Sequence, residues 1–302
     1  MTDRTVLVVA HTGRSDSVDA ALTVLDLLRD GGVTPVLPPK VRNDLADARG
    51  ALDDVRVLGD GARLEDVELV VVLGGDGTIL RAAELARGCA APLLGVNLGH
   101  VGFLAESERD DLHDAIGRVV RREWTVEERL CLDVRVYRGS ELLHQDWALN
   151  EATVEKAARE RMLEVVLEVD SRPLSSFGCD GVVVSTPTGS TAYAFSAGGP
   201  VMWPELDALL CVPLSAHALF ARPLVVSPRS VVAVEVLRRT DASGVLWCDG
   251  RRTFPLVPGA RVEVRASDVP VRLARLHEGP FTDRLVHKFD LPVASWRGPV
   301  TP

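Results

Sequence analysis

The sequence lacks an excess of basic residues, a membrane-length apolar run and any paired cysteine motif. Its 302 residues include 34 Lys and Arg against 43 Asp and Glu, a net charge of −9. A basic stripe that would bind DNA or RNA is therefore not expected. The apolar runs are only strand-length, which argues against a membrane span. The five cysteines are scattered without a CxxC pair, which favours reduced thiols in a cytoplasm and predicts no cysteine metal site.

The first residues do not resemble a secretion signal. The apolar segment Thr5–Ala10 is shorter than a signal-peptide core and leads into His11 without a cleavage site. We therefore expect a cytoplasmic protein with no membrane partner and no nucleic-acid partner. With 46% hydrophobic residues, a chain of this length can bury a substantial core, and we expect two domains.

Two common nucleotide-binding motifs are also absent. No glycine-rich loop ends in Gly-Lys-Ser/Thr, and Leu80 occupies the position of the third Rossmann glycine. The central feature instead is ELVVVLGGDGTILRAAELAR, residues 68–87. It predicts a buried strand, a glycine turn at 74–77 and a helix. Such a turn lets backbone N–H groups approach an anion, and the following helix start adds partial positive charge.

One carboxylate, Asp76, lies inside this glycine turn. A carboxylate at an anion site can bind a metal or accept a proton from an attacking hydroxyl, and phosphoryl transfer needs both kinds of help. The turn is therefore a candidate phosphate site. The simpler alternative is a tight strand-to-helix turn in which Asp76 only caps the helix.

The first part of the chain alternates strands and helices. Strands are predicted at residues 4–10, 33–37, 69–73 and 92–97, and helices at 17–30, after the glycine turn and at 110–120. Residues 40–65 are polar and ambiguous. The alternation predicts an α/β N-terminal domain with a parallel, doubly wound sheet over residues 1–123. Ligands of such sheets bind at the carboxyl ends of the strands, which is where Asp76 lies.

Helical spacing nearly disappears after Trp124. Alternating strands are predicted at residues 130–137, 142–148, 162–169, 174–177, 231–237, 245–248, 260–266 and 271–276. This pattern predicts a β-rich, sandwich-like C-terminal domain over residues 124–276. The tail, residues 277–302, has a mixed pattern, and we expect it to pack back on the N-terminal domain.

Three further segments are rich in polar or glycine residues. PLLGVNLGHVGFLAE (92–106) places glycines after a strand, for close packing or for a ligand. WALNE (147–151) ends a strand with an amide and a carboxylate, which can hold a ribose or an adenine edge or simply be solvated. FGCDGVVVSTPTGSTAYAFSAGGP (177–200) is a hydroxyl-rich run that fits either a loop around a polar ligand, with Tyr193 for base stacking, or a linker.

With GGDGT, LGVNLGHVGFL, NE and DGVVVSTPTGSTAYAFSAGGP in this order, the chain resembles the NAD kinases, from about residue 69 to its end. The resemblance implies an α/β domain, a β-rich domain and a tail that crosses back. It also implies transfer of the γ-phosphoryl of ATP, or of polyphosphate, to the 2′-hydroxyl of the adenosine ribose of NAD, with a divalent metal such as Mg²⁺. Because members of this family are dimers or tetramers, the resemblance also implies a homodimer or homotetramer.

The resemblance also implies roles for particular residues. Asp76 matches the general base, and Gly77 and Arg81 match substrate-contacting positions beside it. The other implied substrate-binding residues are Asn150, Glu151, Arg161, Asp180, Thr191, Ala192, Tyr193, Ala194, Phe195 and Ser196. Gly178 stands where some members carry a bulky basic residue, a difference that accompanies use of NADH or polyphosphate. No metal ligand is implied by the pattern.

Two alternatives remain at this point. GGDG alone is shared with diacylglycerol and sphingosine kinases, which would need an apolar site for their acceptor, whereas the hydroxyl-rich run here is polar. A dinucleotide sensor without catalysis would have little use for an acid inside the phosphate turn. His11, His100 and His217 have no triad or ligand spacing, so we interpret them as structural; the alternative for His217 is a contact with the substrate site of a neighbouring subunit.

Overall fold

The chain of the computed structural model divides into two compact units, residues 1–128 with 271–302 (unit 1) and residues 129–270 (unit 2). The structure describes residues 4–50, 52, 55–99, 102–108, 111–239, 242–277 and 279–293. The unit bounds differ from the expected boundaries because β8 (Thr125–Arg129) and β21 (Val271–Arg275) both join the sheet of unit 1.

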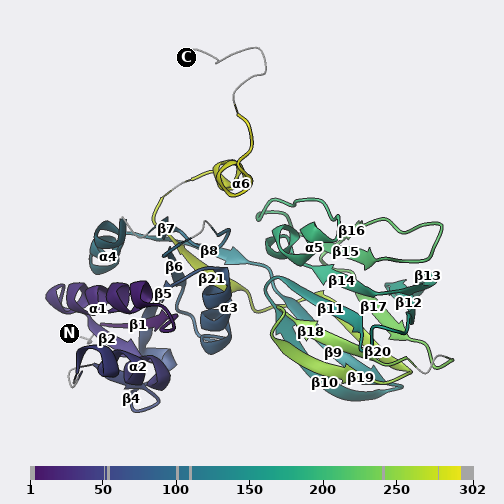
Figure 1. Ribbon diagram of the computed structural model, residues 1–302, viewed down its shortest axis with the longest axis horizontal. Helices are drawn as coiled ribbons and strands as arrows, with labels where there is room; N and C mark the ends of the chain where they lie inside the picture. The colour runs from purple at the N-terminus through teal and green to yellow at the C-terminus, as the bar shows by residue number, and fades with distance from the viewer. Residues whose placement is uncertain are drawn as a thin grey trace. The chain divides into compact units, whose positions relative to one another are not determined.

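Unit 1 is built on a nine-stranded sheet within the described residues (Figure 1). Its order is β4-β3-β2-β1-β5-β6-β21-β8, with β7 beside β6. The remaining strands are β1 (Thr5–Ala10), β2 (Thr34–Leu37), β3 (Arg56–Leu58), β4 (Gly61–Ala62), β5 (Val67–Leu73), β6 (Leu93–Asn97) and β7 (Ser107–Glu108). β1 pairs in parallel with β2 on one side and with β5 on the other. The chain therefore changes direction across the sheet between β1 and β5, the place where doubly wound sheets bind ligands.

Helices cover both faces of this sheet. They are α1 (Ser15–Asp30), α2 (Pro39–Arg49), α3 (Asp76–Leu85) and α4 (Leu112–Arg121). A short 3₁₀ turn, η1 (Leu64–Asp66), precedes β5, and α6 (Phe281–Phe289) contacts the loop after β6. Leu94 and Val96 of β6 belong to the core that α1, α2 and α4 complete. Between them, Gly95 faces the opposite way, toward Ile79 of α3. The predicted doubly wound parallel sheet is confirmed.

Some segments of unit 1 were ambiguous or expected elsewhere. The polar residues 40–65 contain most of α2 and the short edge strands β3 and β4. The strand expected at 271–276 pairs in parallel with β6 through Leu273 and Leu93, although we had expected it in the β-rich half. Strand alternation predicts a strand without specifying which sheet receives it. Residues 294–302 lie outside the described residues.

Within the described residues, unit 2 contains two six-stranded sheets whose neighbouring strands all pair antiparallel. One has the order β10-β9-β20-β17-β12-β13 and the other β16-β15-β14-β11-β18-β19. The strands are β9 (Leu132–Arg138), β10 (Glu141–Ala148), β11 (Glu151–Lys156), β12 (Leu163–Val169), β13 (Arg172–Cys179), β14 (Gly181–Ser185), β15 (Leu209–Leu214), β16 (Leu224–Val226), β17 (Val232–Val236), β18 (Gly244–Cys248), β19 (Arg252–Leu256) and β20 (Ala260–Ala266). Two short helical turns follow β14, namely η3 (Thr188–Thr191) and α5 (Tyr193–Ser196).

The two sheets of unit 2 share one apolar core. Along β9, Leu132, Val134 and Val136 are buried, whereas the intervening Asp133 and Arg135 are partly exposed. The buried positions of the second sheet, such as Val182 and Val184, belong to the same core. Inward and outward alternation of this kind defines a sandwich, so the predicted β-rich, sandwich-like half is confirmed.

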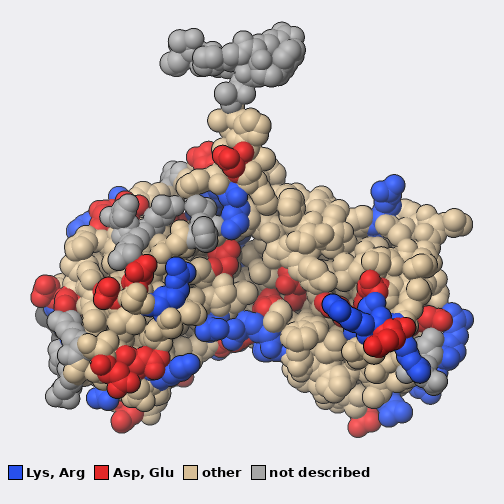
Figure 2. All heavy atoms as spheres, in the orientation of Figure 1, with Lys and Arg blue, Asp and Glu red and all other residues tan. Residues whose placement is uncertain are grey.

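The surface carries charges of both signs. On the face shown in Figure 2, Lys and Arg side chains lie among Asp and Glu over both units, and they do not gather in one basic area. No helix in the described part of the chain combines the length and the apolar character needed to cross a membrane.

Candidate functional site

The glycine turn between β5 and α3 has one sterically required glycine. Gly74 has φ +149°, and a Cβ there would come within 2.5 Å of the Thr78 hydroxyl oxygen. Gly75 and Gly77, by contrast, have nothing within 4 Å of the Cβ position and are exposed. Their bare backbone therefore leaves room for a ligand at the start of α3, where free N–H groups attract anions.

Asp76 is the first residue of α3, and its carboxylate is held by a different loop. Oδ2 accepts a hydrogen bond from the backbone N–H of Phe103 at 3.0 Å, and Oδ1 accepts one from Leu104 at 3.1 Å. The N-cap of α3 is Gly75, without a side-chain cap bond, so the alternative that Asp76 only caps the helix is wrong. Each carboxylate oxygen accepts one bond and keeps a lone pair, which leaves the group able to accept a proton.

The loop after β6 can approach Asp76 so closely because of Gly102. A Cβ at this position would come within 2.3 Å of Asp76 Oδ1. The glycines of residues 92–106 were predicted to mark a close approach to a backbone or a ligand. Gly102 marks a close approach to a side chain.

A cavity of about 380 Å³ opens beside the glycine turn, at the carboxyl ends of β1, β5 and β6. It is lined by His11, Arg14, Ser17, Gly74, Gly75, Thr78, Asn97, Leu98 and Gly99. The first turns of α1 and α3 contribute Ser17 and Thr78 to this lining. A cavity with helix starts, an arginine and bare glycine backbone has the chemistry of a phosphate site.

Sequence reasoning missed two cationic or polar members of this site, His11 and Arg14. His11 was interpreted as structural, yet it lines the cavity, and its Nδ1 is buried without a hydrogen-bond partner among the described residues. Their position directly after β1 could have identified them, since the carboxyl ends of parallel strands meet at one edge. Of the predicted residues nearby, Gly77 and Arg81 are both exposed on α3.

In unit 2, Asn150 and Glu151 lie where β10 passes into β11. Asp249, in the turn after β18, accepts hydrogen bonds from the backbone N–H groups of Leu149 at 3.0 Å and Asn150 at 2.7 Å. Its own N–H donates to the Glu151 carbonyl at 2.9 Å. Burial raises the pKa of Asp249, and these backbone donors oppose that rise. Asp249 was not predicted, because no local sequence motif indicates that a carboxylate will accept backbone hydrogen bonds from residues about 100 positions away.

The Glu151 carboxyl is buried and only partly satisfied. The backbone N–H of Tyr193 hydrogen bonds to it, whereas Oε2 has no partner within the described chain. Burial, followed by the nearby charge of Asp249, raises the pKa of Glu151 to about 8. Glu151 is therefore protonated at neutral pH and can donate a hydrogen bond. This contact joins the predicted NE pair and Tyr193 of the hydroxyl-rich run in one cluster.

Asp180 and Tyr193 extend the same cluster. The Asp180 carboxylate forms an ion pair with Lys156 at 2.5 Å and a hydrogen bond with Ser215, and the Lys156 bond lowers its pKa. Burial raises the pKa of Tyr193, and the charges of Glu155, Asp180 and Glu151 act in the same direction. Tyr193 is 40% exposed, so its ring can receive a base beside these polar groups.

The hydroxyl-rich run is used differently from our prediction. Ser185, Thr186 and Ser190 are fully buried. Thr186 donates to the Leu149 carbonyl at 2.6 Å, and Ser190 donates to Pro187 and accepts from the N–H of Met202. The interpretation that all these hydroxyls surround a ligand is wrong for these three, because they stabilise the turns that lead to α5.

The other predicted residues of unit 2 have varied surroundings. Thr191 and Ala192 are half-buried, Phe195 and Ser196 are exposed, and Ala194 is fully buried in a small core. Arg161 is exposed between β11 and β12. A Cβ at Gly178 would come within 2.1 Å of the Met162 sulfur, so a larger residue there requires this side chain to move.

No group of three or more His, Cys, Asp or Glu side chains within the described residues could hold a metal ion. Among the lining residues of the phosphate-type cavity there is also no carboxylate. Mg²⁺ is commonly bound through substrate phosphates and water with only one or two protein carboxylates. The residues therefore fit an ion that arrives with a phosphate ligand, with Asp76 as the adjacent carboxylate.

Both units match models of one protein family. A model described as the ATP-NAD kinase N-terminal domain matches residues 6–124, and one described as the ATP-NAD kinase C-terminal domain matches residues 149–276. Two solved structures share the fold. They are yeast NADH kinase complexed with NADH (TM-score 0.85, 20% identity, covering 100% of this chain and 91% of that one) and an NAD kinase from Archaeoglobus fulgidus in complex with ATP (TM-score 0.72, 24% identity, 96% and 100%).

Curated relatives are similar over nearly the whole chain. The NAD kinase of Leifsonia xyli subsp. xyli is 66% identical over 296 residues, covering 98% of this chain and 97% of the relative. NAD kinase 2 of Streptomyces coelicolor is 61% identical, and the NAD kinase of Mycobacterium leprae is 50% identical, each with 98% and 97% coverage. With both domain models matched and this identity over its length, the chain belongs to the NAD kinase family.

Proposed function

We propose that this protein transfers the γ-phosphoryl group of ATP to the 2′-hydroxyl of the adenosine ribose of NAD, giving NADP and ADP. Its family membership at 66% identity over 98% of the chain makes it an enzyme with NAD kinase activity. The observation that carries the mechanism is the Asp76 carboxylate, which two backbone N–H groups orient beside the glycine turn.

Asp76 is the general base of this proposal. A sugar hydroxyl is a weak nucleophile at neutral pH, so a carboxylate must accept its proton as the oxygen attacks the γ-phosphorus. The bond from the γ-phosphorus to the β,γ-bridging oxygen breaks, ADP leaves with that electron pair, and the proton passes to Asp76. The bonds from Phe103 and Leu104 hold the carboxylate in one orientation, which is the main contribution that a protein can make to such a transfer.

The donor phosphates occupy the cavity at the carboxyl ends of β1, β5 and β6 in this proposal. The exposed backbone of Gly75 and Gly77 supplies N–H groups, and Arg14 supplies a charged donor. A divalent metal, Mg²⁺ by its preference for phosphate oxygens, would accompany the donor and neutralise its charge. In this proposal the cavity binds the phosphate chain of the donor, so inorganic polyphosphate is the alternative donor to be compared with ATP.

The NAD side of the proposal uses the cluster of unit 2. Asn150 and the protonated Glu151 offer hydrogen bonds to the adenosine, and the exposed Tyr193 ring offers a stacking face. Asp180 would contact the substrate beside Lys156. We also assign substrate contacts to Gly77, Arg81, Arg161, Thr191, Ala192, Phe195 and Ser196, with Ala194 as a buried support.

The experiment that tests this function measures NADP formation by purified protein. ATP and polyphosphate are compared as donors, and NAD and NADH as acceptors. Asp76→Asn removes the proton acceptor but keeps the shape, so we expect kcat to fall by about 100-fold or more while NAD still binds. Asp114→Asn, on the exposed side of α4, is the matched control and should retain full activity. Near-normal turnover of Asp76→Asn would exclude the base assignment, and binding of NAD without turnover by the wild type would indicate a sensor.

We also propose that the protein self-associates and acts in the cytoplasm. Leu219, Phe220 and Val225, on and beside β16, are 112%, 55% and 57% exposed, and apolar exposure of this kind is typical of an interface. In Figure 2, drawn in the orientation of Figure 1, the surface over β15 and β16 shows few Lys, Arg, Asp or Glu side chains. All five cysteines are free thiols, which suits a reducing compartment.

A further inference from the structure

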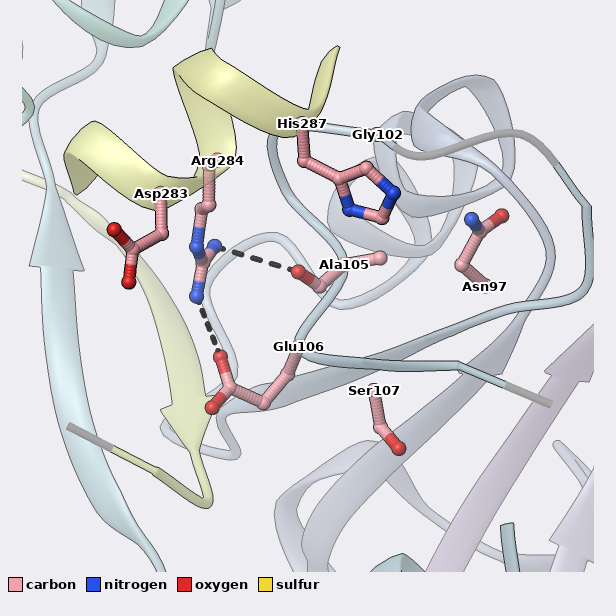
Figure 3. Close-up of a pocket in the computed structure, with 8 residues that line it drawn as sticks. All are labelled: Asn97, Gly102, Ala105, Glu106, Ser107, Asp283, Arg284 and His287. Carbon is pink, nitrogen blue, oxygen red and sulfur yellow. Dashed lines mark hydrogen bonds and ion pairs between the residues drawn. The ribbon is translucent and has the colours of Figure 1, made fainter. Parts of the chain in front are cut away.

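Helix α6, near the end of the described chain, lies against the segment of residues 102–107 that holds Asp76. Figure 3 shows Arg284 of α6 directed toward Ala105 and Glu106 of this segment, with the His287 ring beside them. A cavity of about 190 Å³ remains between the helix and the segment. Both parts belong to unit 1, although they are far apart in the sequence.

Arg284 binds the backbone of this segment directly. Its Nη1 donates to the carbonyl oxygens of Phe103 at 3.2 Å and Ala105 at 3.3 Å, and its Nη2 donates to Glu106 Oε2 at 2.8 Å (Figure 3). The N–H groups of Phe103 and Leu104 meanwhile point to the Asp76 carboxylate. The same short backbone is therefore bonded through its carbonyls to α6 and through its amides to Asp76.

Glu106 holds the Arg284 guanidinium in place. Its side chain is only 2% exposed, and Oε2 also accepts from Arg275 at 3.0 Å. Oε1 accepts from the backbone N–H groups of Leu276 and His277, both at 3.0 Å. A buried carboxylate with four donors holds a charged partner in one geometry. Removal of Arg284 would leave three of these donors, so Glu106 would not become an unpaired buried charge.

Aromatic packing supports the same contact. The Phe103 ring is 8% exposed. Its centroid lies 6.0 Å from that of Phe281 and 5.7 Å from that of Phe289, in tilted arrangements that favour ring edges against faces. The first and last residues of α6 therefore both contact Phe103, whose amide is one of the two that hold Asp76.

We propose that Arg284 is a positioning residue for phosphoryl transfer: through the carbonyls of Phe103 and Ala105 it fixes the amides that orient the Asp76 carboxylate. This role rests on the proposed function, in which Asp76 accepts the proton of the ribose hydroxyl. Arg284 itself has no contact with substrate in this role. Misplacement of a catalytic group by about 1 Å can cost about 100-fold in rate, so loss of this support is expected to lower kcat.

The test measures kcat and the KM values for NAD and ATP of Arg284→Ala and Arg284→Lys. We expect Arg284→Ala to lower kcat by about 10- to 100-fold with each KM within about threefold of wild type, because only the base is displaced. Lysine can donate one of these hydrogen bonds but lacks the planar set of N–H donors of the guanidinium. Arg284→Lys should therefore recover part of the lost kcat. Arg63→Ala removes an exposed, ion-paired arginine of the same unit and should leave kcat unchanged.

A double variant separates positioning from general stability. If Arg284 acts through Asp76, Arg284→Ala should lower kcat by no more than about twofold when Asp76→Asn is already present. An equal loss in both backgrounds, or an unchanged kcat in folded Arg284→Ala, would overturn the positioning role and leave the base assignment intact. Near-normal turnover of Asp76→Asn alone would instead overturn the base assignment. If Arg284→Ala does not fold, the same comparison is made with Arg284→Lys.

Discussion

Replacement of Glu151 by glutamine should make unit 2 more stable at neutral pH. The Glu151 carboxyl is 6% exposed and lies beside Asp249, and its pKa is raised from 4.5 to about 8. Between these two values the folded protein keeps a proton that the unfolded chain has released. Because the folded state binds more protons there, the free energy of unfolding falls as pH rises from about 4.5 to about 8. Glutamine has nearly the same shape and never ionises, so it removes this contribution.

The size of the effect follows from the pKa values. Each pH unit in that window costs about 1.4 kcal/mol. At pH 7, 2.5 units above 4.5, the cost is therefore about 3 kcal/mol. With a urea m-value of about 2 kcal/mol/M, the wild-type midpoint should fall by about 1 M between pH 5 and pH 7. Asp249, whose pKa is raised in the same direction, contributes to the pH dependence that remains in Glu151→Gln.

Urea unfolding measured by tryptophan fluorescence at pH 5, 6, 7 and 8 tests this reasoning. Trp147 and Trp247 lie in unit 2 and report on its unfolding. Glu205→Gln changes an exposed carboxyl of the same unit and should follow the wild type at every pH. If the midpoints of Glu151→Gln and wild type change in parallel from pH 5 to pH 8, Glu151 is ionised in the folded protein and the argument is wrong.

Two further predictions concern the donor site and the exposed apolar surface. Arg14→Ala should raise the KM for ATP by about 10-fold or more, since it removes a charge-assisted bond to phosphate. The KM for NAD should stay within about twofold of wild type. An unchanged KM for ATP would exclude this arginine from the donor site. Leu219→Asp with Phe220→Asp should reduce the mass of the assembly measured by light scattering at equal protein concentration, because charge disfavours a buried apolar interface. If the wild type is a monomer, or if the mass of the variant is unchanged, this interface is wrong.

The motifs predicted the family and the fold class, and both are confirmed. The strand at residues 69–73 and the helix after Gly77 follow from local apolar spacing, which needs no tertiary information. Local spacing could not predict that the carboxylate of Asp76 would receive the amides of Phe103 and Leu104, because these residues are 27 and 28 positions away. The hydroxyl-rich run was misread in part for the same reason, since composition does not tell whether a hydroxyl faces a ligand or a backbone carbonyl.

The order of strands and helices, the glycine turn and the identity of its acid could be predicted from the sequence, because they depend on neighbouring residues and backbone freedom. The distant groups around each acid became known from the folded chain. They are the amides of the loop after β6 around Asp76, Asp249 beside Glu151, and the arginine of α6 behind the loop. The orientation, protonation and reactivity of a carboxyl depend on such neighbours, since burial and hydrogen bonds act over a few ångströms in space and are indifferent to separation along the chain.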